Sequence, residues 1–264
     1  MKSGSFVHAT KPNWHAAVVY YLLACAWSWP FFWWRDMHSE SWTALCFPYP
    51  LKMSLIMWGP GLAALACFVL FRRTHRRTIT FVGGALWRSL AFYFLPMLGL
   101  AVIGVPVGED GQVSHVFVGL LAVLSLFNIL GEELGWRGFL QDALRPLART
   151  PRYLLIAVLW IVWHFSNNFA DMSQAGFFTR LAWYVPTTIA LCVVIGESTD
   201  RSRAVLIAVT LHGWMDLCFE FPSTGIYIVT AFALPFWGWL LWTWPQSPVS
   251  VDPMPGTDSL VATG

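Results

Sequence analysis

The chain alternates long apolar runs with short polar connections that are rich in arginine. A run of about 20 mostly apolar residues can cross a bilayer as a helix. Eight such runs are predicted to be spanning helices, at residues 14–34, 53–71, 89–108, 116–141, 153–170, 181–196, 204–219 and 226–243. The sixth and seventh are short, which leaves tilted, loop-extended and partly re-entrant forms open. The pattern predicts an all-α fold, a polytopic membrane bundle of about eight transmembrane helices.

Composition agrees with a membrane location. The chain is 57% hydrophobic and 11% charged, whereas soluble domains carry about 25% charged residues. Tryptophan and tyrosine favour bilayer interfaces, and tryptophans cluster near the ends of the first and last predicted spans, at positions 27, 29, 33, 34, 237, 239, 242 and 244. The lipid bilayer is therefore an expected partner. A nucleic-acid partner is not expected, because the arginines lie in short loops beside apolar spans.

The distribution of positive charge predicts the orientation in the cell membrane. With eight spans and an inside N-terminus, 13 of the 16 lysines and arginines lie on the cytoplasmic side, and the other three are Arg35, Lys52 and Arg180. Positive residues concentrate on the cytoplasmic side of membrane proteins, so both termini are predicted to be cytoplasmic. Residues 1–244 are predicted to form a single transmembrane domain, 245–264 a disordered tail, and 197–203 a solvated cytoplasmic loop.

A few polar groups interrupt the apolar spans. Glu132 and Glu133 follow the uncharged run 116–131, and two further spans each carry one histidine, His164 and His212. An ionisable side chain inside a membrane is costly and marks a candidate functional site. At the rise of a helix, Glu132, His164 and His212 lie roughly 13, 16 and 12 Å from the cytoplasmic ends of their spans. Three helices thus bring polar groups to one level, which predicts a single site in the cytoplasmic half of the bilayer.

Helical spacing assigns partners within each span. Glu133 and Arg137 are four residues apart, with the glutamate on the N-terminal side, which is the favourable order for an ion pair. The side chain of Glu132 points about 100° away from that of Glu133 around the helix axis, and it is left without a partner in this ion pair. His212 and Asp216 have the same spacing and are predicted to hydrogen-bond, which would fix the tautomer of the histidine.

Gly131 and Gly135 bracket the two glutamates. Small residues four apart let helices approach closely in membranes. Two interpretations stay open: ordinary membrane packing, or access for a neighbouring helix or a substrate backbone to Glu132.

These residue types indicate hydrolysis by activated water. A glutamate in a low-dielectric site can act as a general base near neutral pH, and nearby histidines can hold the water or donate to an oxyanion. The sequence holds neither Gly-x-Ser-x-Gly nor HExxH, and its five cysteines form no CxxC pair. Two alternatives stay open: helix–helix hydrogen bonds without catalysis, and the proton pathway of a proton-coupled membrane transporter, for which inverted repeats would be expected and none is found.

Three short motifs resemble those of the CPBP intramembrane proteases, also called the Abi family, whose best-known member is the eukaryotic CAAX prenyl endopeptidase. The motifs are Glu132-Glu133-x-x-x-Arg137, Trp160-x-x-x-His164 and His212-x-x-x-Asp216. They span residues 132–216, on the fourth, fifth and seventh predicted helices. Their order and placement, together with the eight-span pattern, carry the resemblance.

The resemblance implies an endopeptidase in which Glu132 activates water together with His164. It implies that His212 and its i+4 partner stabilise the oxyanion, and that Glu133 and Arg137 support them. The implied substrate is a peptide or protein with a membrane-proximal cleavage site, as in CAAX processing or bacteriocin maturation. A non-catalytic member that acts in bacteriocin self-immunity by binding remains an alternative.

Two residues depart from the family pattern. Trp160 stands where phenylalanine is usual, and it is expected to change only packing. Asp216 stands where asparagine is common, and an ionised carboxylate cannot donate to an oxyanion. Asp216 is therefore expected to be protonated, to orient His212 or to bind a metal. The family has been described both as metal-dependent and as metal-independent; Glu132, His164 and His212 could hold zinc with one open position. Without HExxH-like spacing, no cofactor is expected, with zinc as the alternative.

Overall fold

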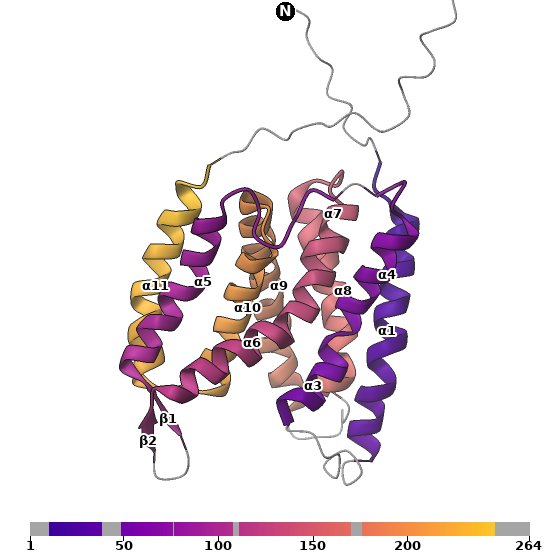
Figure 1. The fold of residues 1–264 in the computed structure, drawn as a ribbon. Coiled ribbons are helices and arrows are strands. Elements are labelled where there is room, and N and C mark those ends of the chain that lie inside the picture. Colours follow the sequence, from indigo (N-terminus) through magenta and orange to yellow (C-terminus); the bar gives the residue numbers. More distant parts are fainter. Residues whose placement is uncertain (1–10, 39–48, 76, 108–110, 170–175, 246–264) are drawn as a thin grey trace, which may run out of the picture.

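The computed structural model describes residues 11–38, 49–75, 77–107, 111–169 and 176–245, and nearly all of its regular structure is helical (Figure 1). The helices are α1 (Trp14–Met37), α3 (Tyr49–Met57), α4 (Gly59–Leu70), α5 (Leu86–Ile103), α6 (Val116–Gly135), the π-helix η1 (Trp136–Leu140), α7 (Gln141–Ala143), α8 (Arg149–Phe169), α9 (Phe177–Ser202), α10 (Val205–Glu220) and α11 (Thr224–Trp242). The strands are β1 (Val105–Val107) and β2 (Gln112–Ser114).

These helices confirm the predicted polytopic membrane bundle. Each of the eight predicted spans coincides with a helical segment of the described chain, the second built from α3 and α4 and the fourth from α6, η1 and α7. Within the described residues, six segments are long and apolar enough to cross a membrane by length and composition. The two segments that fall short are α8 and α10. The beginning of α1 and the end of α11 lie at one end of the bundle (Figure 1), which fits an even number of crossings.

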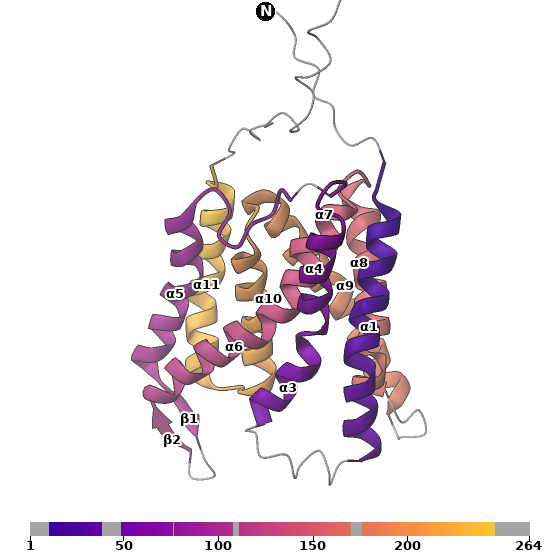
Figure 2. The ribbon, with the colours of Figure 1, turned by 45° about the vertical axis from the view of Figure 1, so that its right-hand side comes forward.

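The second span is broken between α3 and α4. Pro60 lies in the first turn of α4, where its missing N–H costs nothing and its ring excludes a continuous helix from before it. Figure 2 shows α3 inclined to α4 and lying beside α6. A Cβ on Gly61 would lie 2.7 Å from Gly131 O, and one on Gly131 would lie 2.8 Å from Met57 O. The packing interpretation of Gly131 is thereby confirmed, because the backbones of the second and fourth spans touch there.

Gly135 shows the same close packing one turn later. A Cβ on it would lie 2.4 Å from the Tyr20 hydroxyl and 2.6 Å from Pro60 O. Both glycines of the small-residue pair therefore serve the approach of α1 and α4 to α6. The space beside both glycines is filled by protein, so it is neighbouring helices rather than a substrate backbone that lie there.

The fourth span widens into a π-helix directly after the two glutamates. The N–H of Gln141 donates to Trp136 O, five residues back. A π turn inserts one extra residue into the helix and shifts the faces that follow it. All five residues of η1 are buried, so the wider turn is held by packing on every side.

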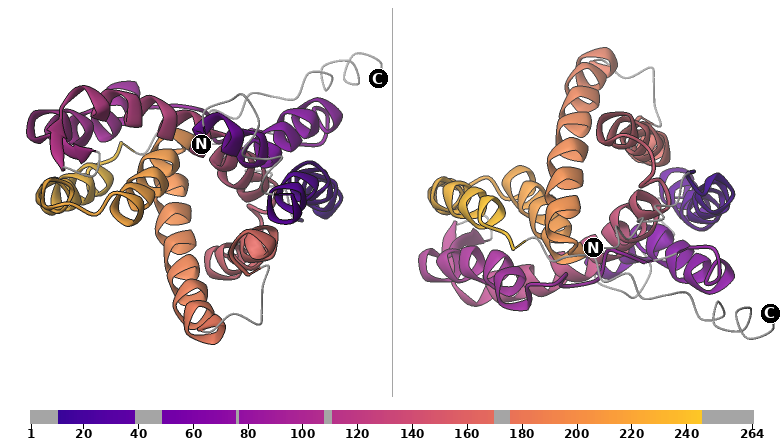
Figure 3. Two further views of the ribbon diagram at one scale, coloured as in Figure 1. Left: turned by 90° about the horizontal axis from the view of Figure 1, so that it is seen from below. Right: turned by 90° about the horizontal axis from the view of Figure 1, so that it is seen from above.

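Helix α10 lies in the interior of the bundle. It contacts α5, α6, α9 and α11, and Figure 3 shows it between α11 and α9, with α5 and α6 along a third side. On the other side of α6, α1 packs against α4 and α8. Many apolar side chains on the outer faces are exposed, among them Val102, Trp183 and Phe232, as expected for surfaces that face lipid.

Two predicted boundaries are wrong. The third span was predicted to reach residue 108, but α5 ends at Ile103, Gly104 adopts a φ of +81°, and the β1–β2 hairpin follows with Val105 opposite Ser114. The predicted loop 197–203 is mostly helical, because α9 continues to Ser202. Asp200 is bound by residues of other helices, whereas the side chain of Glu197 is 48% exposed. The predicted tail, 245–264, lies outside the described residues apart from residue 245.

Asp200 shows why this end of α9 is helical. Its carboxylate accepts hydrogen bonds from Gln141 Nε2 at 2.9 Å and Tyr153 Oη at 2.7 Å, and it also pairs with Arg152. Arg201, the next residue, donates from Nη2 to Trp242 O at 2.5 Å. That bond satisfies a terminal carbonyl of α11 with a positive charge, which also suits the helix dipole. The charged residues of 197–203 therefore join four helices at the predicted cytoplasmic end.

Candidate active site

The structure brings the predicted polar residues of three helices together inside the bundle. Glu132 lies on α6, His164 on α8 and His212 on α10, and their exposed fractions are 3%, 8% and 4%. Asp216, on α10, is half-buried. Helix α6 crosses the bundle between two groups of helices, α1, α4 and α8 on one side and α5, α10 and α11 on the other (Figure 1). Its central position lets it present Glu132 to residues from both groups.

Glu132 has two neighbours from α8. Its Oε2 accepts a hydrogen bond from Trp160 Nε1 at 2.9 Å and lies 3.8 Å from His164 Nε2. The second distance is too long for a direct hydrogen bond. The expectation that Trp160 changes only packing is wrong, since its indole donates to a carboxylate, which a phenylalanine ring cannot do.

His164 is oriented by its own helix and by aromatic rings. Its Nδ1 lies 3.3 Å from Trp160 O, one turn earlier. A carbonyl only accepts, so Nδ1 is the protonated nitrogen and Nε2 carries the lone pair that faces Glu132. The imidazole packs edge-on against Trp163, with ring centroids 4.4 Å apart. The face of His164 toward Glu132 is therefore a hydrogen-bond acceptor.

His212 takes its partner from another helix. Its Nδ1 lies 2.8 Å from Glu133 Oε1, and a carboxylate only accepts, so Nδ1 donates. The predicted hydrogen bond to Asp216 does not form, because His212 Nε2 and Asp216 Oδ2 are 3.8 Å apart. Spacing along one helix cannot reveal a contact between α6 and α10. The sequence therefore gave no indication that His212 pairs with Glu133.

Glu133 also forms the predicted pair with Arg137. Arg137 Nε lies 3.4 Å from Glu133 Oε2, and both side chains are fully buried. Arg137 Nη2 lies 3.5 Å from Cys192 Sγ on α9. Buried charges need partners, since an isolated one is strongly unfavourable in a low-dielectric interior. Glu133 thus links the charge of Arg137 to the ring of His212, behind the cluster of Glu132 and His164.

Residues 114–218 match the model of the family described as type II CAAX prenyl endopeptidase Rce1-like. The segment is Rce1-like. This match confirms the resemblance to the CPBP and CAAX protease family that the three motifs predict. The Rce1-like segment runs from the end of β2 through α10 and contains all six predicted site residues. A search of curated proteins found no match.

The described residues of the Rce1-like segment contain no preformed cluster of metal ligands. Within the described part of the chain, no three or more His, Cys, Asp or Glu side chains are placed to hold one ion. The Nδ1 atoms of His164 and His212 are already engaged by Trp160 O and Glu133. Their Nε2 atoms face Glu132 and Asp216, so the choice between a metal-independent site and the zinc alternative rests on the effect of a chelator.

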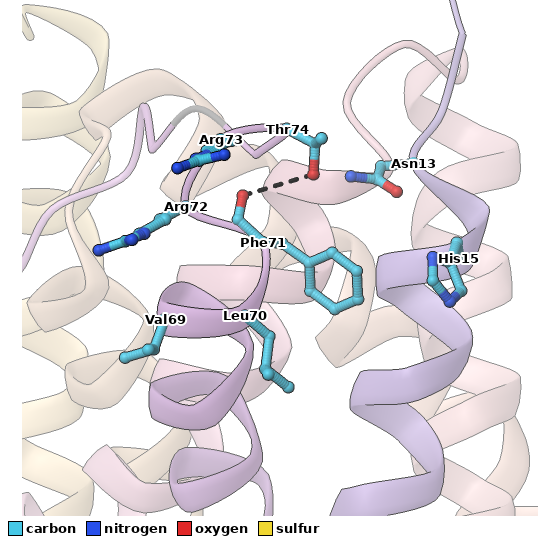
Figure 4. A pocket seen from close by; sticks show the side chains of 8 residues that line it. All are labelled: Asn13, His15, Val69, Leu70, Phe71, Arg72, Arg73 and Thr74. Carbon is cyan, nitrogen blue, oxygen red and sulfur yellow. Dashed lines mark hydrogen bonds between the residues drawn. The ribbon is translucent and has the colours of Figure 1, made fainter.

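A surface hollow lies away from this cluster, at the end of α4. It is lined by Asn13, His15 and residues 69–74 (Figure 4). Its two arginines, Arg72 and Arg73, follow the C-terminus of α4, where positive charge suits the helix dipole. They belong to the positively charged side of the protein and contribute nothing to the cluster on α6, α8 and α10.

Proposed function

We propose that this protein is an intramembrane endopeptidase in which Glu132 activates water to hydrolyse a peptide bond. The observation that carries the proposal is the placement of the Glu132 carboxylate 3.8 Å from the accepting nitrogen of His164, in the interior of a membrane bundle. A water oxygen at about 2.8 Å from both atoms closes a triangle on this separation. Water held there faces two acceptors and can give a proton to the stronger base.

In the proposed reaction Glu132 takes one proton from the water molecule while the water oxygen attacks the peptide carbonyl carbon. The C–O bond forms, and the carbonyl oxygen becomes an oxyanion. Glu132 then returns the proton to the amide nitrogen as the C–N bond breaks. This use of one carboxylate as base and then acid is general acid–base catalysis.

We assign the oxyanion to His212. Its ring lies between two carboxylates, Glu133 at 2.8 Å from Nδ1 and Asp216 at 3.8 Å from Nε2. An imidazolium between them carries a proton on both nitrogens, and its Nε2–H can donate to a developing negative charge. Asp216 then balances the charge of the ring rather than donating to the oxyanion itself.

The proposed substrate is a peptide or protein with a membrane-proximal cleavage site, cut in the cytoplasmic half of the bilayer without a metal cofactor. The buried, multi-helix setting supports a substrate that enters from the membrane, and the Rce1-like match supports a peptidase. Both termini are proposed to be cytoplasmic, because the arginine-rich connections lie at the end of the bundle where α1 begins and α11 ends (Figure 1).

Cleavage by purified protein in nanodiscs tests the proposal. The probes are synthetic peptides that end in CAAX sequences, prenylated and unprenylated, with products read by mass spectrometry. Glu132→Gln keeps the shape and removes the base, so we expect cleavage to be abolished. Glu197→Gln is the matched control, because Glu197 lies on α9 with its side chain 48% exposed. Near-full activity of Glu132→Gln, or no cleavage of any probe by the unmodified protein, would refute the proposal.

A further inference from the structure

Trp160 contacts the proposed base and both histidines of the candidate site. Its Nε1 donates to Glu132 at 2.9 Å. Its ring meets the imidazole of His164 edge-on, with centroids 5.2 Å apart, and that of His212 at 5.0 Å. Arg137 Cζ lies 5.9 Å from the centroid of the same ring. With 4% of its surface exposed, the indole is buried between three helices, and both imidazoles meet its ring edge-on.

Burial of a tryptophan in this bundle does not by itself require a hydrogen bond from its indole N–H, so the bond from Trp160 to Glu132 is a specific feature. The indole nitrogens of Trp136 and Trp163 are also buried, and neither has a hydrogen-bond partner among the described residues. Packing in this bundle therefore accommodates a tryptophan without pairing its N–H. At Trp160 the N–H instead meets the carboxylate of the proposed base.

We propose that Trp160 is a positioning residue for Glu132, acting through its indole N–H. The inference rests on the proposed function of Glu132. The bond to Oε2 holds the carboxylate in one rotamer, so that its remaining lone pairs face the gap toward His164. It also stabilises the charged form of the carboxylate, because a hydrogen bond donated to an ionised group favours that group's ionised state.

Two substitutions separate the N–H from the ring. Trp160→Phe removes the donor and part of the ring. Replacement of Trp160 by benzothienylalanine, through genetic code expansion, exchanges the N–H for sulfur and keeps the bicyclic shape. Trp136, buried without a partner for its N–H, receives the same two replacements as the matched control.

The measurement is kcat and KM for peptide cleavage between pH 5 and 9, in nanodiscs. We expect both Trp160 variants to lose kcat by about tenfold to hundredfold, the loss of one charge-assisted hydrogen bond, with KM changed by less than about twofold. We also expect the acid limb of the pH–rate profile to move to higher pH, which a loss of packing alone would not cause. The Trp136 variants should keep the profile of the unmodified protein.

The outcomes separate this inference from the proposed function. If Glu132→Gln abolishes cleavage but the benzothienylalanine variant at 160 keeps both kcat and the pH profile, the positioning role of Trp160 is wrong and the function of Glu132 stands. If Glu132→Gln remains active, both proposals fall. If Trp160→Phe does not fold, the benzothienylalanine variant alone decides the test, because its bicyclic side chain preserves the packing.

Discussion

Gly131→Ala tests whether the fourth span is held by direct backbone contact. The added Cβ would lie 2.8 Å from Met57 O and 2.9 Å from Trp58 Cα. Both atoms belong to backbone, which cannot move aside as the end of a flexible side chain can. Helix α6 or the α3–α4 junction must therefore shift by some tenths of an ångström.

The expected magnitude follows from two opposing effects. Alanine in place of glycine favours a helix by about 1 kcal/mol, whereas overpacking a close contact costs about 1–3 kcal/mol and occasionally more. We expect a net loss of up to about 2 kcal/mol, and each kcal/mol lowers the melting temperature of a chain of this size by about 2–4 °C.

Gly119→Ala is the matched control, since Gly119 lies on the same helix with no atom within 4 Å of the position of a Cβ. There the propensity effect acts alone, and stability should stay level or rise. Thermal unfolding of both variants in nanodiscs, followed by intrinsic tryptophan fluorescence, provides the comparison. Cleavage should fall in Gly131→Ala as well, because the next residue is Glu132 and small displacements of a catalytic group are costly. Equal stability of the two variants would contradict the close backbone contact.

Three further predictions concern the buried charges and the cofactor. Glu133→Gln should lower stability by about 3–5 kcal/mol, because it leaves the buried guanidinium of Arg137 unpaired; the double variant with Arg137→Met should regain part of this loss in the same unfolding assay. Asp200→Asn should cost about 1–3 kcal/mol through its three donors while sparing cleavage, whereas Glu197→Gln should change stability by less than about 0.5 kcal/mol. Cleavage should persist after treatment with 1,10-phenanthroline; loss that added zinc restores would establish a metal requirement.

Apolar runs were enough to predict the helices, because bilayer thickness determines the length of a span. They predicted the extent of α9 poorly, since hydropathy stops at residue 196 while the helix runs on to Ser202. The last six residues are polar and helical because partners on other helices, such as Gln141 and Arg152 for Asp200, satisfy them. Contacts of that kind depend on tertiary structure, which local composition does not encode.

In the candidate site, too, contacts within one helix were predictable and contacts between helices were not. The pair of Glu133 and Arg137 follows from spacing within one helix, and the structure contains it. The bonds from His212 to Glu133 and from Trp160 to Glu132 join residues 79 and 28 positions apart. Hydrophobic pattern and helical spacing cannot predict pairs between residues on different helices. The π turn at Trp136–Leu140 was equally invisible, because its sequence reads as an ordinary helix.

The polar side chains Glu132, His164 and His212 are buried inside the bundle. The two helical segments outside the six candidate spans are α8 and the 16-residue α10, and they carry His164 and His212. Helix α10 can hold a histidine and an aspartate because other helices, rather than lipid, cover most of its surface. A polar group inside a membrane is tolerated where protein surrounds it. An interior helix of an otherwise apolar bundle can therefore hold a catalytic group without exposing it to lipid, as α10 holds His212.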